Sequence, residues 1–207
     1  IKLSIFIDSF FMNNKSIGFF DSGIGGITIL NSIIKLLPKE NTIYLADSIN
    51  SPYGTKSNEE LIKICKKNVE FLINSGGCKL IVIACNTATT NCISYLRQNY
   101  KIPFIGIEPA IKPAALNTKT GKIGVLATKG TLGSNLFEKT STLHGQNIEI
   151  IEKQVNGLVE LIEKGIFSGS KIDILLEKYI TPMINIGIDK LVLGLSLIHI
   201  SEPTRHR

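Results

Sequence analysis

Short apolar runs rich in β-branched residues alternate along the chain with longer segments whose apolar residues recur every three or four positions. The short runs predict buried strands, and the helically spaced segments predict amphipathic helices. The predicted strands cover residues 17–20, 81–83, 123–126 and 191–193, and the predicted helices cover residues 27–37, 61–72 and 157–163. Strands that alternate with helices indicate an α/β fold built on parallel sheets.

The pattern of the first half recurs in the second half of the chain. Residues 15–20 are echoed by residues 121–126, and residues 81–85 are echoed by residues 191–195 at nearly the same offset. We therefore expect two similar α/β halves, each an open parallel sheet, that face each other across a cleft. The expected domains are residues 12–108 and 109–194, the second of them incomplete, with a hinge at Gly106–Pro113, where two prolines interrupt the pattern.

The most informative segment is Ala84-Cys85-Asn86-Thr87, which directly follows the predicted strand 81–83. Asn and Thr are typical of helix starts, and ligands in open α/β sheets bind beyond the carboxyl ends of the strands. We therefore expect Cys85 to lie in a ligand site, where the positive end of the helix dipole would lower the pKa of its thiol. The alternative is a small buried apolar cysteine with a purely structural role.

A glycine-rich turn, Asp21-Ser22-Gly23-Ile24-Gly25-Gly26, follows the predicted strand 17–20. Its glycines allow the backbone to approach a small ligand, and the helix that follows offers free N–H groups to a carboxylate. The turn lacks the Gly-Lys-Ser/Thr of a P-loop, and its spacing does not match the dinucleotide-binding pattern. Asp21 would repel a phosphate but suits an ammonium group, which favours a zwitterion such as an amino acid.

Five blocks of residues, in this order, resemble the motifs of the glutamate racemases in the aspartate/glutamate racemase family. The blocks are Asp21–Gly26, Tyr44–Asp47 with Pro52-Tyr53-Gly54, Ala84–Ala88, Gly106–Pro109, and Gly124–Thr128 with Gly130-Thr131. Aspartate racemases share the architecture, but the Pro-Tyr-Gly block and the Asp-Ser-Gly-x-Gly-Gly turn are closer to the glutamate enzymes. The resemblance extends over residues 15–194.

The resemblance implies a cofactor-independent isomerase that interconverts L- and D-glutamate by proton transfer between two cysteines. Such an enzyme supplies D-glutamate for peptidoglycan synthesis, and so serves cell wall biogenesis and cell shape. Cys85 would act on one face of the α-carbon, and Asp21 would orient the ammonium group or assist the thiol. The residues expected to bind the substrate are Asp21, Ser22, Pro52, Tyr53, Gly54, Asn86, Thr87, Thr128 and Thr131. Glu163 resembles a family glutamate near the cleft, although an ordinary exposed acid fits equally well.

The repeat places Leu195 at the position that corresponds to Cys85, where the family carries its second cysteine, followed by Thr and His. We therefore expect this chain to be inactive as a racemase. Two alternatives remain open, an aspartate racemase and a catalytically dead amino-acid-binding protein that kept the cleft. Residues 195–207 contain two of the three arginines and two of the three histidines, so we expect a foreign tail. Residues 1–11 are expected to be a non-native extension, because Met12 precedes a natural start of the first strand.

Composition narrows the class of protein further. The 207 residues, 43% of them hydrophobic, can bury the core of one or two domains. Four cysteines without a Cys-x-x-Cys pair, and no apolar run of spanning length, predict a reduced cytoplasmic protein without a metal site. The net charge of +6 comes from lysines spread over helix surfaces, which predicts neither a nucleic-acid nor a membrane partner. The expected partner is a small-molecule substrate, glutamate, and the candidate assembly is a homodimer.

Overall fold

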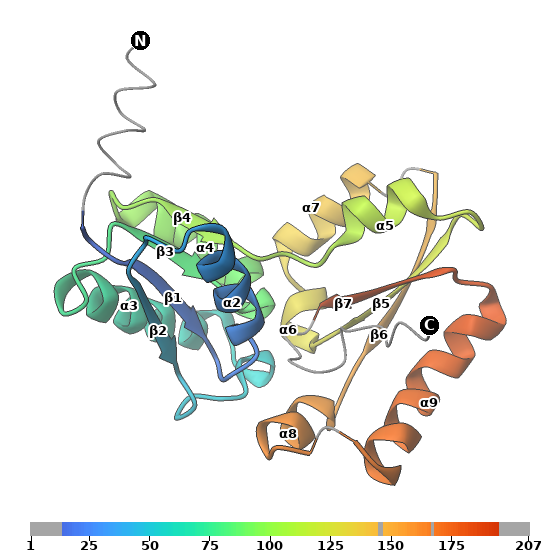
Figure 1. Ribbon diagram of the computed structural model, residues 1–207. Coiled ribbons are helices and arrows are strands. Elements are labelled where there is room, and N and C mark those ends of the chain that lie inside the picture. Colours follow the sequence, from blue (N-terminus) through green and yellow to red (C-terminus); the bar gives the residue numbers. More distant parts are fainter. Residues whose placement is uncertain (1–13, 145–146, 167, 195–207) are drawn as a thin grey trace.

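The computed structural model describes residues 14–144, 147–166 and 168–194 and shows an α/β protein with two parallel sheets, as the sequence predicts (Figure 1). The first sheet has the strand order β2-β1-β3-β4, and the second has the order β6-β5-β7. The strands are β1 (Ile17–Asp21), β2 (Thr42–Ala46), β3 (Leu80–Ile83), β4 (Phe104–Gly106), β5 (Lys122–Ala127), β6 (Glu149–Gln154) and β7 (Lys190–Gly194). In both sheets the first strand pairs with the second and the third, which confirms the internal repeat.

Helices connect the strands and cover the sheets. The first half contains α2 (Ile27–Leu36), the short 3-10 helix η1 (Tyr53–Thr55), α3 (Asn58–Asn74) and α4 (Asn86–Asn99). The second half contains α5 (Ile111–Asn117), α6 (Lys129–Leu132), α7 (Asn135–His144), α8 (Leu158–Glu163) and α9 (Ser170–Ile186). None of the helices within the described residues is long and apolar enough to cross a membrane.

Both central strands are buried on their two faces, which explains why residues 17–20 and 123–127 carry no polar side chain. Phe19 belongs to the apolar cluster under α2, and its neighbour Phe20 belongs to the cluster under α3 and α4. In the second sheet Val125 packs in the cluster with α5 and α7, and Leu126 packs with α8 and α9. Successive side chains of each central strand therefore fill different cores.

The parallel register places the functional strand ends at one edge of the first sheet. Phe20 is paired with Ile83, and Asp21, the last residue of β1, is paired with Ala46 of β2. Cys85 follows β3 by two positions, so it emerges at the same edge as Asp21. In the second sheet Ala127 is paired with Gly194, and Thr128 leaves β5 at the corresponding edge.

Helix α3 is the longest helix of the first half and begins at a complete capping box. The Ser57 hydroxyl accepts from the backbone N–H of Glu60 at 3.3 Å, and the Glu60 carboxylate accepts from the backbone N–H of Ser57 at 2.9 Å. This reciprocal pair satisfies two N–H groups that a helix start leaves without partners. The predicted apolar face of this helix is confirmed: its buried side chains include Leu61, Cys65, Val69 and Leu72.

The segment between the halves is shorter than expected. Strand β4 ends at Gly106 and α5 begins at Ile111, so Pro113 lies within the first turn of a helix rather than in an interruption. A proline is tolerated there because the first N–H groups of a helix have no intrahelical acceptor. The domain limits and the homodimer stay predictions. Residues 1–11 and 195–207, including Leu195, lie outside the described residues.

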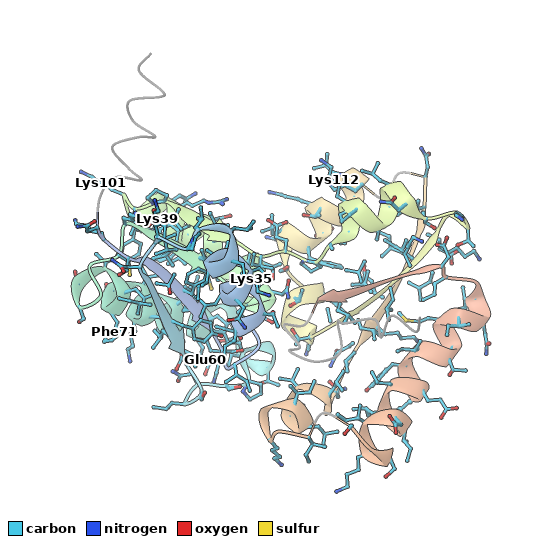
Figure 2. The ribbon with its side chains drawn as sticks, viewed as in Figure 1. Lys35, Lys39, Glu60, Phe71, Lys101 and Lys112 are labelled. Atoms are coloured by element: carbon cyan, nitrogen blue, oxygen red, sulfur yellow. The ribbon has the colours of Figure 1, made fainter. Side chains whose placement is uncertain are left out.

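The surface charge is distributed over separate elements. Lys35 and Lys39 lie at the end of α2 and just beyond it, Lys101 precedes β4, and Lys112 lies on α5; all four are exposed (Figure 2). Solvated lysine faces of this kind agree with the interpretation of the charge made from the sequence. All four cysteines are free and buried.

Candidate active site

Cys85 lies at the junction of β3 and α4, where the sequence places it. Its side chain caps the helix, since the Sγ atom accepts a hydrogen bond from the backbone N–H of Ala88 at 3.5 Å. Asn86 is the first residue of the helix, in line with the expectation that Asn or Thr would begin it, and Cys85 is the residue that caps it. The thiol also lies 3.9 Å from the hydroxyl of Ser22, to which it donates.

The pKa of the Cys85 thiol is raised to about 12, which corrects the expectation that the helix start would lower it. Burial is the main cause, because the side chain is only 6% exposed and a thiolate would lose its hydration there. The negative charge of Asp21 raises the pKa further. Hydrogen bonds from Ala88 and Ser22 favour the thiolate, but they do not outweigh these two effects.

Asp21 is held at the end of β1 by the turn that follows it. Its Oδ2 atom accepts from the backbone N–H of Gly26 at 2.9 Å, and the residue is 2% exposed. Burial raises the pKa of this carboxyl group, while the backbone N–H groups of Gly26, Ser22 and Gly23 act in the opposite direction. A Cβ at Gly26 would lie 2.6 Å from the Cβ of Ala84, so only glycine fits this close approach between the start of α2 and the end of β3.

Three threonine hydroxyls form a triangle where the halves meet. The Oγ1 atom of Thr87 lies 3.0 Å from that of Thr128 and 3.1 Å from that of Thr131, and the latter two are 3.2 Å apart. Thr87 belongs to α4, whereas Thr128 caps α6 and Thr131 lies within α6. The structure therefore brings together three residues that the sequence analysis expected in the site, from both halves of the chain.

Further contacts hold this junction closed. The Asn91 side chain donates to the backbone carbonyls of Thr87 and Gly130, both at 2.8 Å, and so joins α4 to α6. A Cβ at Gly54 would lie 2.6 Å from the Cβ of Thr128, so the Pro-Tyr-Gly block packs directly against the second half. Asn91 is a junction residue that the sequence analysis did not identify; no motif distinguishes it from an ordinary helical asparagine.

Asn86 carries an acceptor without a partner. Its Oδ1 atom is buried, has no hydrogen-bond partner, and belongs to a side chain that is only 6% exposed. A buried amide oxygen left in this state costs free energy, so such a group is rare in a folded protein unless it serves a ligand. Asn86 directly follows Cys85, and it is therefore placed to accept a hydrogen bond from a ligand at the thiol.

The Tyr53 hydroxyl forms hydrogen bonds with Asp47 and Asn68 and not with the three threonine hydroxyls. The hydroxyl donates to Asp47 Oδ2 at 2.5 Å and accepts from Asn68 Nδ2 at 2.9 Å. Burial raises the pKa of Tyr53, and the hydrogen bond to Asp47 adds to this effect. The only proton of the hydroxyl is thus committed to Asp47. Asn68 was not identified from the sequence, because a single polar residue on an apolar helical face carries no motif.

Two cavities lie beside this junction. The first, of about 260 Å³, is lined by Pro52, Gly54 and Thr55 from the first half and by Thr128, Gln154 and Glu160, among others, from the second. The second, of about 400 Å³, shares Pro52, Val159 and Glu160 with the first. Cys85 and Asp21 line neither cavity. Glu160 of α8 lines both cavities. The role expected for Glu163 stays a prediction, because its side chain lies outside the part of the chain that the structure describes.

The fold and the site define an α/β protein of two facing parallel-sheet halves, with a thiol and a carboxylate at adjoining strand ends. Residues 25–194 match the Asp/Glu/hydantoin racemase family. The chain belongs to this family, and the prediction of an amino-acid racemase, an isomerase, is confirmed at that level.

Similar proteins agree with this assignment. A glutamate racemase from Clostridium botulinum (strain Kyoto / Type A2) is 46% identical over 193 residues, which are 93% of this chain and 75% of that protein. The structure of Escherichia coli glutamate racemase in complex with L-glutamate and the activator UDP-MurNAc-Ala has a TM-score of 0.79 at 31% identity and covers 88% of this chain and 70% of that chain. Glutamate racemase from Francisella tularensis in complex with D-glutamate has a TM-score of 0.76 at 33% identity, with 88% and 69% covered.

Proposed function

We propose that this chain binds glutamate between its two halves and that Cys85 transfers a proton at one face of the α-carbon. The observation that carries the proposal is the pairing of a buried thiol with a buried carboxylate at adjoining strand ends. The relatives named above are glutamate racemases, and two solved structures hold L- or D-glutamate. These facts support glutamate over aspartate as the substrate.

Each group of the site has a role in this proposal. The Asp21 carboxylate receives the α-ammonium group, and Asn86, with its free Oδ1 atom, accepts a second N–H of the same group. The hydroxyls of Thr87, Thr128 and Thr131 exchange their mutual hydrogen bonds for bonds to a substrate carboxylate. Ser22 and the backbone at Pro52 and Gly54 complete the pocket. Tyr53 holds this backbone in place through the hydrogen bond of its hydroxyl to Asp47.

Substrate binding also prepares the thiol. An ammonium group beside Asp21 offsets the negative charge that raises the pKa of Cys85, so the pKa of the thiol falls when the substrate is bound. The Cys85 thiolate then takes the proton from the α-carbon, and the electron pair of the broken C–H bond moves into the adjacent carboxylate group. No cofactor takes part in this step. Because Cys85 and Asp21 are buried, we infer that the halves separate at the threonine triangle to admit the substrate.

The proposed chemistry of this chain is limited to one face. Its four cysteines are Cys65, Cys78, Cys85 and Cys92, and all of them belong to the first half. In a two-cysteine racemase the opposite face receives its proton from a second thiol, which the second half of this sequence does not supply. We therefore propose that Cys85 returns the proton to the face from which it came and that this chain does not racemise glutamate. In related chains with both thiols, the same chemistry would supply D-glutamate for peptidoglycan in the cytoplasm.

Substrate choice can be tested by an NMR titration of the full chain with L-glutamate, D-glutamate, L-aspartate and D-aspartate. We expect glutamate to shift the backbone amide signals of Gly54, Asn86 and Thr131, and aspartate to shift them far less at the same concentration. Binding of aspartate without binding of glutamate would contradict the substrate assignment and favour the aspartate racemase alternative. Binding of glutamate without proton exchange would favour a binding protein.

A further inference from the structure

Residues 47–54, here called the 47–54 loop, run from the end of β2 into the first two residues of η1 and form a wall of both cavities. Pro52 and Gly54 line the cavity of about 260 Å³, and Ser48, Ser51 and Pro52 line the cavity of about 400 Å³. The loop also meets the second half where Gly54 packs against Thr128. Its conformation therefore decides both the shape of the cavities and the contact between the halves.

Asp47 is the centre of the contacts that hold this loop. Its backbone N–H donates to the carbonyl of Asp21 at 2.9 Å, so the loop starts beside the strand end that carries the site carboxylate. Its carboxylate accepts from Tyr53 at 2.5 Å and from Asn50 at 2.8 and 3.0 Å. The carboxylate bonds to Tyr53 and Asn50 close the loop on itself, so they do not attach it to the helices of the first half.

Asn68 supplies such an attachment from α3. Its Nδ2 atom donates to Asp47 Oδ2 at 3.1 Å and to the hydroxyl of Tyr53 at 2.9 Å, so both N–H bonds of the amide are used on the loop. The orientation of the amide is fixed chemically, because a rotated amide would place its oxygen against the carboxylate of Asp47. The side chain is 8% exposed and lies on the face of α3 that otherwise buries apolar residues.

We propose that Asn68 is a positioning residue, which holds the 47–54 loop in the conformation that the substrate requires. A buried amide on an apolar helical face is unfavourable unless its hydrogen bonds are satisfied, and an aliphatic residue would pack there at lower cost. The presence of an amide at this buried position is therefore explained by its two hydrogen bonds to the loop and not by packing in the apolar core. The effect on the substrate rests on the proposed function, whereas the effect on the loop does not.

The test compares three full-length proteins, the wild type, Asn68→Leu and Val69→Ala. Asn68→Leu keeps a side chain of similar size in the helix but removes both donors. Val69→Ala removes buried volume at the adjacent position of α3, where Val69 is fully buried, and leaves the hydrogen bonds of Asn68 to the loop in place. Thermal melting measures the stability of each variant, and NMR measures the amide signals of Tyr53, Gly54 and Thr55 and the dissociation constant of glutamate.

We expect Asn68→Leu to shift or broaden these amide signals and to weaken glutamate binding roughly tenfold, as the loss of two buried hydrogen bonds suggests. We expect Val69→Ala to lower the melting temperature but to leave the signals and the affinity close to the wild type. Unchanged signals and affinity in Asn68→Leu would overturn the proposal, and so would an equal loss in Val69→Ala.

A wild type that binds no glutamate would instead refute the proposed function. In that case the backbone amide signals of Tyr53, Gly54 and Thr55, recorded without glutamate, test the role of Asn68. A change confined to Asn68→Leu supports the positioning role, and the same signals in all three proteins overturn it.

Discussion

Burial and the neighbouring carboxylate of Asp21 hold the Cys85 thiol in its protonated form, with a pKa raised to about 12. Hydrogen bonds to the Asp21 carboxylate favour its ionised form, but burial outweighs them and leaves the pKa of Asp21 raised. At neutral pH and without substrate, the Cys85 thiol is therefore protonated and does not act as a base. A cysteine of this kind becomes a base only when the charge beside it changes.

Replacing Asp21 by Asn should make Cys85 more reactive. The substitution removes the negative charge that opposes the thiolate, so the pKa of Cys85 falls and its alkylation by iodoacetamide at mildly alkaline pH becomes faster. Each unit by which the pKa falls gives about a tenfold larger thiolate fraction while the thiol remains mostly protonated, and the rate rises by less because a thiolate of lower pKa is a weaker nucleophile. Mass spectrometry of the peptide that contains Cys85 measures the rate. Glu70→Gln removes a half-buried carboxylate of α3 and is the control, which should leave the rate unchanged. Equal rates in Asp21→Asn and the wild type would refute the coupling.

Replacing Gly54 by Ala should loosen the junction of the halves. The new Cβ would lie 2.6 Å from the Cβ of Thr128, so η1 and α6 must move apart and the 3.0 Å contact between Thr87 and Thr128 lengthens. Overpacking of this kind costs about 1–3 kcal/mol of unfolding free energy. Urea denaturation measures the loss. Gly133→Ala is the matched control, because its Cβ meets only the carbonyl oxygen of Lys129, at 3.3 Å. If both variants lose the same unfolding free energy, the close approach of Gly54 to Thr128 does not contribute to stability.

Asp189 should stabilise the second half in a pH-dependent way. Its carboxylate accepts from the Thr118 hydroxyl and from the backbone N–H of Lys119, both at 2.6 Å, and these bonds lower its pKa from 3.8 to about 2. A folded pKa below the unfolded value means that the stabilisation is present above the unfolded pKa of 3.8 and is lost as the pH falls toward 2.

Asp189→Asn should accordingly lower the melting temperature at neutral pH, and its difference from the wild type should shrink as the pH falls from about 5 to about 2. Calorimetry at a series of pH values measures this difference. A difference that stays constant over that range would show that the charge of Asp189 contributes nothing.

The elements that were predicted from the sequence rest on local patterns, whereas β2, β4 and β6 were not predicted. Continuous apolar runs such as 81–83 identify strands buried on both faces, and the spacing of Leu61, Cys65, Val69 and Leu72 identifies α3. The position of Cys85 follows from the same local rule, since it stands between a strand and a helix. The recurrence of these patterns also revealed the two sheets.

The properties that were not predicted depend on neighbours distant in sequence. The pKa of Cys85 was predicted in the wrong direction, because the helix start is a local feature whereas burial and Asp21 are not. The commitment of the Tyr53 hydroxyl to Asp47 depends on the path of a loop that no periodicity describes. Asn68 and Glu160 were overlooked for the same reason: each is one polar residue in a helical pattern, and only the packing of α3 and α8 gives it a partner or a cavity.

The most direct test of the central claim follows the α-proton of glutamate by proton NMR in deuterium oxide, with the full chain and L- or D-glutamate supplied separately. The account predicts that one enantiomer exchanges its α-proton for deuterium without conversion to the other, because removal and return use the same face. Cys85→Ser should slow this exchange on the order of a hundredfold or more, the usual effect of losing a general base. Exchange in Cys85→Ser at the wild-type rate, or conversion of either enantiomer by the wild type, would contradict the account.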